Sequence, residues 1–193
     1  MQSGITYEQA RKLFDKYVKS PVMRNHCRSS EVVMRALAKH LEEDEELWGI
    51  AGLLHDIDYE LTQGDTKQHG ILCQEILGEA GMSQELIDVI VAHVYGAEGG
   101  HYWDRIRMTE FEHALAASET VTGLIYAYGL MRPDKKLANA EVKSIKKKFK
   151  DKSFAAKVDR GVILECDNLG LELNEFLKLS LDAMKEIADE IGL

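Results

Sequence analysis

The stretch Trp48-Gly-Ile-Ala-Gly-Leu-Leu-His-Asp-Ile-Asp-Tyr-Glu60 is an apolar run that ends on an adjacent imidazole and carboxylate. Residues 47–54 are apolar or glycine throughout, which predicts a helix that is buried on most of its sides. His55 and Asp56 stand at the end of this helix. An unpaired buried carboxylate is costly, so we expect Asp56 to be paired with a cation, hydrogen-bonded or bound to a metal ion.

Other potential metal ligands lie on further predicted helices or at their ends: His26, His69, His93 and Glu119. Neutral imidazole and carboxylate are common ligands of zinc, iron, manganese and related ions. A His-Asp pair by itself fits a capped, hydrogen-bonded helix end better than it fits a metal site. The ordered set of donors around the pair is what favours a metal site.

The order of His26, then His55-Asp56, then a late acid resembles the HD-domain superfamily of metal-dependent phosphohydrolases. The texts His55-Asp-Ile-Asp-Tyr-Glu, His69-Gly-Ile-Leu-Cys-Gln-Glu-Ile-Leu and Ala92-His93 are similar to the branch with extra histidines between the His-Asp pair and the last acid. The likeness runs from residue 20 to the C-terminus and includes Thr122-Gly-Leu-Ile and Lys148-Phe-Lys-Asp-Lys-Ser-Phe-Ala-Ala. One position departs from the pattern, because the family's last ligand is usually Asp and the matching residue here is Glu119.

The resemblance implies one or two divalent transition-metal ions, of iron, manganese, zinc or nickel, held by His26, His55, Asp56, His69, His93 and Glu119. The first ion would be bound by His26, His55, Asp56 and Glu119, and His69 and His93 would complete a second site. Asp56 would bridge the two ions. His55 and Asp56 are therefore also the predicted catalytic residues, acting through a metal-activated water.

The composition favours helices. The 193 residues include only 2 prolines and 7% aromatics, and no run of alternating β-branched residues suggests a sheet. We expect an all-α, single-domain, HD-type helical bundle over residues 1–193, with its core at about 20–130 and C-terminal helices at 138–193 packing on it.

Several helix starts can be read from capping residues. Thr6 with Gln9 has the form of a capping box, Ser20-Pro21 precedes a long helix, and Ser83 opens another. Asp65 or Thr66 is the predicted N-cap of a helix that carries His69 in its first turn.

Charge and cysteine usage restrict the partners. The net charge of -9 opposes attraction to nucleic acid and to anionic membranes, but a small metal-bridged anion is compatible with it. The 3 cysteines are widely spaced and form no Cys-x-x-Cys pair, as expected of reduced thiols in a cytoplasm. No signal peptide and no apolar stretch of ~18 residues is present, so we expect a cytoplasmic protein.

A basic segment supplies the predicted phosphate contacts. Residues 143–160 hold seven lysines and one arginine against two aspartates, a local charge of +6. A solvated, lysine-covered helix pair is the favoured explanation of this charge, and a basic rim that attracts phosphate to the metal pocket is the functional alternative. From this segment Lys150, Lys152 and Arg160 are the predicted substrate-binding residues, together with His101 in a glycine-rich loop.

The sequence therefore predicts a phosphohydrolase that acts on a nucleotide or another small phosphate ester. Two alternatives stay open: a non-catalytic metal- or ligand-binding scaffold with a sensing role, and a di-iron oxygenase on the same fold. The expected partner is a small phosphorylated molecule. The amphipathic last helix closes the bundle or serves a homodimer interface.

Overall fold

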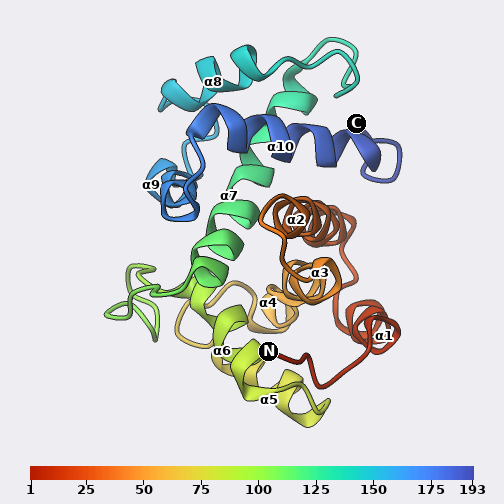
Figure 1. The fold of residues 1–193 in the computed structure, drawn as a ribbon, viewed down its shortest axis with the longest axis vertical. Coiled ribbons are helices and arrows are strands. Elements are labelled where there is room, and N and C mark those ends of the chain that lie inside the picture. Colours follow the sequence, from red (N-terminus) through yellow and green to blue (C-terminus); the bar gives the residue numbers. More distant parts are fainter.

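The computed structural model describes all residues 1–193, and its regular elements are all helical, as predicted (Figure 1). The helices are α1 (Tyr7–Tyr17), α2 (Pro21–His40), α3 (Glu45–Leu54), α4 (Tyr59–Thr62), α5 (Ile71–Glu79), α6 (Gln84–Val91), α7 (Glu110–Met131), α8 (Val142–Lys150), α9 (Arg160–Ile163) and α10 (Leu173–Glu186). Two short 3₁₀ helices, η1 (Ala92–Val94) and η2 (Leu164–Leu169), follow α6 and α9.

The apolar run forms α3, which is the buried helix of the fold. Every residue from Leu47 to Leu54 is buried, and Asp44 caps the helix by accepting the N–H groups of Glu46 and Leu47. Helix α3 packs closely on α2, because a Cβ atom added at Gly52 would lie 2.7 Å from the Ser30 carbonyl oxygen of α2. The glycine therefore sets the separation of the two helices.

Helix α7 runs along the molecule between α8 and α10 at one end and α5 and α6 at the other (Figure 1). It contacts α2, α3, α6, α8, α9 and α10. Small buried side chains at Ala114, Ala117 and Ser118 allow this close packing. One hydrophobic cluster runs from Ile5 to Leu193, so the C-terminal helices share a core with the N-terminal ones.

The predicted caps are confirmed at three helices. Thr6 and Gln9 form a capping box on α1, Ser20 caps α2, and Ser83 caps α6. The helix predicted to start after Asp65 or Thr66 starts later, at Ile71, so His69 lies in the turn before it.

The reason for this later start is a cap that comes from elsewhere in the chain. Gly70 has a φ of 90°, outside the helical region, and so it ends the preceding turn. The Asp58 carboxylate accepts the N–H groups of Gly70 and Cys73, the role predicted for Asp65 or Thr66. Asp65 instead accepts the N–H of Lys67 within the turn.

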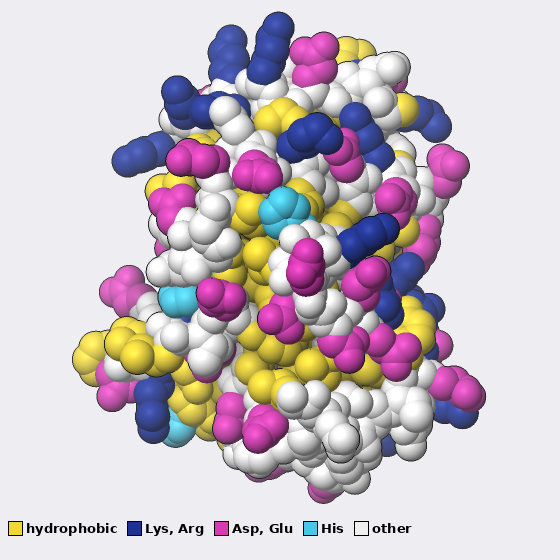
Figure 2. Space-filling model, in the orientation of Figure 1, with side chains coloured by type: hydrophobic (Ala, Val, Ile, Leu, Met, Phe, Trp, Pro, Cys, Tyr) yellow, Lys and Arg dark blue, Asp and Glu magenta, His cyan; other side chains and the backbone are white.

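The surface is uneven in charge. Lys and Arg side chains are most frequent at the end of the molecule where α8 lies, and acidic side chains, with some further Lys and Arg, are spread over the rest of the visible face (Figure 2). The three cysteines are buried and free. None of the helices combines the length and the apolar character that crossing a bilayer requires.

Candidate metal centre

Four imidazoles surround one carboxylate at the centre of the bundle. Asp56 Oδ2 lies 3.5 Å from the Nε2 atoms of both His26 and His55. Asp56 Oδ1 lies 3.2 Å from His69 Nε2 and 3.3 Å from His93 Nε2. The carboxylate therefore stands between two pairs of histidines, and each pair forms with it a group of donors suited to a metal ion. We call these groups the two halves of the centre: His26 and His55 with Asp56, and His69 and His93 with Asp56.

Four different elements bring these ligands together. His26 lies in α2, His55 and Asp56 directly follow α3, His69 precedes α5, and His93 lies in η1. All five side chains are largely excluded from solvent, and His55 is completely buried. The convergence that the sequence predicted for these five residues is thus present in the fold.

Backbone carbonyl groups hold two of the four rings. His55 Nδ1 lies 2.9 Å from the Gly52 carbonyl oxygen, and His93 Nδ1 lies 2.6 Å from that of Ile90. A carbonyl oxygen only accepts hydrogen bonds, so each Nδ1 carries the ring proton. Each Nε2 then presents a lone pair to the centre.

Side chains hold the other two rings in the same way. His69 Nδ1 lies 2.8 Å from Asp58 Oδ1, and His26 Nδ1 lies 3.3 Å from Thr122 Oγ1. The Thr122 hydroxyl donates its own proton to the Glu119 carbonyl, 2.6 Å away, so it accepts from His26. Both Nδ1 atoms are therefore donors, and both Nε2 atoms are free to bind a metal ion.

This tautomer assignment is a test of whether a metal ion fits. His26 Nε2 and His55 Nε2 are 3.0 Å apart, and His69 Nε2 and His93 Nε2 are 3.1 Å apart. If all four rings were neutral, the lone pairs of each Nε2 pair would face each other, so a positive charge, either a proton or a metal ion, has to lie between or beside them. Imidazole nitrogens with a shared carboxylate are the donor set of zinc, iron, nickel and related ions, so a metal ion fits both halves.

The pKa values of the histidine rings also indicate that the centre favours a bound positive charge. Burial lowers the pKa of His69, but its hydrogen bonds to Asp56 and Asp58 outweigh burial and raise that pKa to about 10. Burial lowers the pKa of His55 to about 3, against the attraction of Asp56. One ring of the centre is therefore protonated at neutral pH when no metal ion takes the proton's place.

A family model described as HD domain matches residues 23–145. The chain belongs to the HD domain family. The matched range contains all four histidines, Asp56 and Glu119, which confirms the resemblance that their order suggested. No curated protein and no solved structure matches the chain.

Asp58 is the residue of this HD domain site that sequence reasoning missed. It is completely buried, and its carboxylate accepts hydrogen bonds from the His69 ring and from the N–H groups of Gly70 and Cys73. Asp58 therefore has two roles: it orients the His69 ring, and it caps the start of helix α5. Its signal in the sequence was a second acid within the buried stretch, two residues after Asp56.

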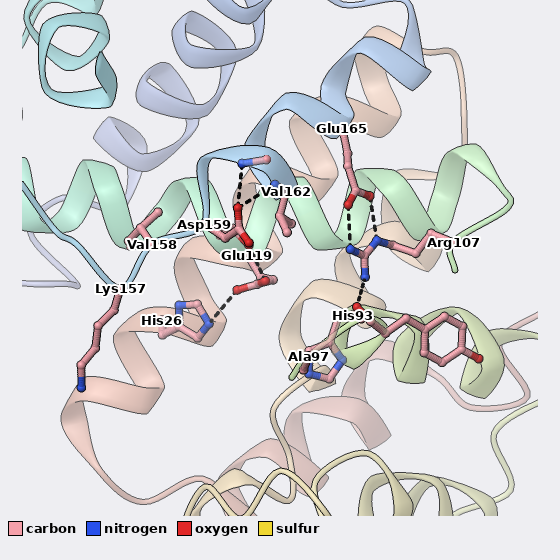
Figure 3. Close-up of a pocket in the computed structure, with 15 residues that line it drawn as sticks. His26, His93, Ala97, Arg107, Glu119, Lys157, Val158, Asp159, Val162 and Glu165 are labelled. Carbon is pink, nitrogen blue, oxygen red and sulfur yellow. Dashed lines mark hydrogen bonds and ion pairs between the residues drawn. The ribbon is translucent and has the colours of Figure 1, made fainter. Parts of the chain in front are cut away.

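Glu119 lies at the edge of the centre. Its Oε2 is 3.8 Å from His26 Nε2, while its Oε1 accepts a hydrogen bond of 2.5 Å from the Thr120 hydroxyl (Figure 3). It is not among the atoms that converge around Asp56. Burial raises the pKa of Glu119 to about 8, against the hydrogen bond from Thr120, so an ion bound by Glu119 would displace a proton.

A cavity of about 640 Å³ opens onto the centre of this HD domain (Figure 3). His26 and His93, one from each half of the centre, line it. The rest of its wall comes from the loop after η1, from α7, and from the segment 157–165. This volume lies within the ~300–1,000 Å³ typical of small-molecule sites.

The predicted substrate-binding residues lie elsewhere. Neither Lys150, Lys152, Arg160 nor His101 lines this cavity. All five N–H groups of Arg160 point at backbone carbonyl oxygens, those of Phe149, Asp151, Phe154, Ala155 and Val158. Arg160 thus holds the loop before α9 together and has no N–H left for a phosphate. The lysine that does line the cavity is Lys157.

Proposed function

We propose that this HD domain is a metal-dependent phosphohydrolase that acts on a nucleotide or another small phosphate ester. The observation that carries the proposal is the centre itself. Two pairs of histidines direct their Nε2 atoms at the carboxylate of Asp56, beside a cavity large enough for such a substrate. Membership of the HD domain family supports the same function.

Divalent ions held in the centre would acidify a water molecule and neutralise the charge that develops on a phosphoryl group. The protein's own part is to fix the donors. Asp56 offers one oxygen to each histidine pair, and the partners of the four Nδ1 atoms lock the rings so that their lone pairs stay inward. The site therefore needs little rearrangement to bind ions.

The test combines metal analysis with an assay of phosphate release. Protein loaded with manganese, iron, nickel or zinc is assayed on a panel of nucleotides and sugar phosphates. Asp56→Asn keeps the size of the shared ligand but removes its charge, and it should lose metal from both halves together with activity. The exposed Asp65, which caps only a turn, supplies the control variant Asp65→Asn, which should behave as wild type.

Two outcomes would contradict the proposal. Full metal occupancy in Asp56→Asn would show that Asp56 is a structural residue. Failure of the metal-loaded wild type to release phosphate from any member of the panel would show that the centre is not a phosphohydrolase site.

A further inference from the structure

We infer that the cavity selects a substrate with one phosphate group and a hydroxyl-bearing body, and that Lys157 is its phosphate-binding residue. This inference rests on the proposed phosphohydrolase function and specifies its substrate class. It concerns the wall of residues 157–165, which lies outside the range 23–145 matched by the family model.

Two cationic side chains line the cavity, and one of them is already neutralised. Arg107 donates from Nε and Nη2 to the two carboxylate oxygens of Glu165, at 2.7 and 2.6 Å. Its Nη1 donates to the carbonyl oxygens of Ala92 and Tyr95, at 2.9 and 3.0 Å. Arg107 therefore joins the segment around η1 to η2, and its charge is not available to an incoming anion (Figure 3).

Lys157 is the other cation, and it is free. Its side chain is exposed and makes no hydrogen bond or ion pair with the rest of the chain. It lies on the His26 side of the cavity, and the Arg107–Glu165 pair lies on the His93 side (Figure 3). In Figure 3 the Lys157 side chain extends along the outer edge of the cavity, and rotation about its flexible stem would bring the ammonium group to a phosphate on the His26 side of the metal centre.

The acidic residues of the wall disfavour further phosphates. Asp159 Oδ1 accepts the N–H groups of Gly161 and Val162, while its Oδ2 makes no hydrogen bond. This free oxygen repels a second phosphate but accepts a hydrogen bond from a hydroxyl group. Glu165 adds little to this repulsion, because Arg107 and His113 already bond its two oxygens and offset its charge.

A substrate with a longer phosphate chain would therefore gain little. Metal–oxygen bonds are only ~2 Å long, so ions in the centre would compensate the phosphate that reacts and not the more distant ones. The more distant phosphates would meet one lysine, the free oxygen of Asp159 and the carboxyl group of Glu119, which also lines the cavity. A single phosphate attached to a neutral body with hydroxyl groups matches this wall in charge and in hydrogen bonding.

The test compares AMP, ADP, ATP and glycerol phosphate as probes of metal-loaded protein, by kcat/KM and by calorimetric binding of AMP in the presence of calcium or another ion that supports no turnover. Wild type should prefer AMP and glycerol phosphate to ATP by about tenfold or more, because each misplaced charge costs roughly that factor. Lys157→Met should weaken AMP binding by about tenfold, the value of one charged hydrogen bond. The control is Lys147→Met, an exposed lysine of α8 outside the cavity, which should change neither quantity.

A second variant tests the acid. Asp159→Asn keeps an oxygen for the Gly161 and Val162 amides but removes the negative charge, so it should narrow the preference for AMP over ATP. Preference for ATP in wild type, or unchanged AMP binding in Lys157→Met, would overturn the inference while leaving the phosphohydrolase function in place. Lys157-dependent binding of AMP without hydrolysis of any probe would leave the inference and overturn the function.

Discussion

Replacing Asp58 by asparagine should remove one half of the metal centre while the protein stays folded. Asp58 Oδ2 accepts the Gly70 and Cys73 N–H groups, and Oδ1 accepts the proton of His69 Nδ1. The asparagine oxygen would keep the two backbone donors, which leaves its NH₂ group facing Nδ1. The His69 ring must then accept at Nδ1 and carry its proton on Nε2, where it blocks the metal ion.

The magnitudes separate this variant from Asp58→Ala. Loss of a partner behind a metal-bound histidine typically lowers metal affinity by ~10–100-fold, and we expect that loss at the half formed by His69 and His93. Asparagine gives up one charge-assisted hydrogen bond, about 1.5–3 kcal/mol of unfolding free energy. Alanine in addition leaves two buried N–H groups without an acceptor, at about 1–3 kcal/mol each.

The assay has two parts. Metal titration of the stripped proteins measures the stoichiometry and affinity of each half, and urea unfolding of the same samples measures stability. Asp58→Asn should bind the ion at His26 and His55 normally and the ion at His69 and His93 weakly, with a modest loss of unfolding free energy. Asp58→Ala should also bind the second ion weakly, and it should lose more unfolding free energy than Asp58→Asn. Two ions bound by Asp58→Asn with wild-type affinity would refute the tautomer argument on which the metal centre rests.

Two further predictions concern ionisation and the edge of the centre. The folded-state pKa of His69, about 10, exceeds its ordinary value of 6.5, so its contribution to stability is complete below about pH 6.5 and is lost as the pH rises toward 10. Urea unfolding of metal-stripped protein should show this decline, and saturation with zinc should remove it; a flat profile without metal would contradict the assignment. Glu119→Gln should weaken the ion held by His26 and His55 by up to ~10-fold, whereas Glu119→Asp should bind as well as wild type or better. Equal affinity of the Gln variant in a metal titration would show that Glu119 is not a ligand.

The sequence by itself determined the features that depend on short windows. An apolar run predicts the buried helix α3, and the pairs Thr6 with Gln9 and Ser20 with Pro21 mark helix starts, because periodicity and capping act over three or four residues. The order of the histidines around Asp56 predicted which side chains meet through its resemblance to the HD-domain pattern, and the donor set is one that a metal ion accepts.

Only the tertiary structure decided which groups hold the histidine rings in place and which basic side chains reach the cavity wall. The start of α5 is set by Asp58 rather than by the nearby Asp65, because a cap can come from a residue twelve positions earlier once the chain has folded back. Among the basic residues near the site, the fold turns Arg160 onto five backbone carbonyls and leaves Lys157 on the cavity wall. Charge and spacing are alike along that lysine-rich segment, so the direction of each side chain follows from packing between elements that no local pattern encodes.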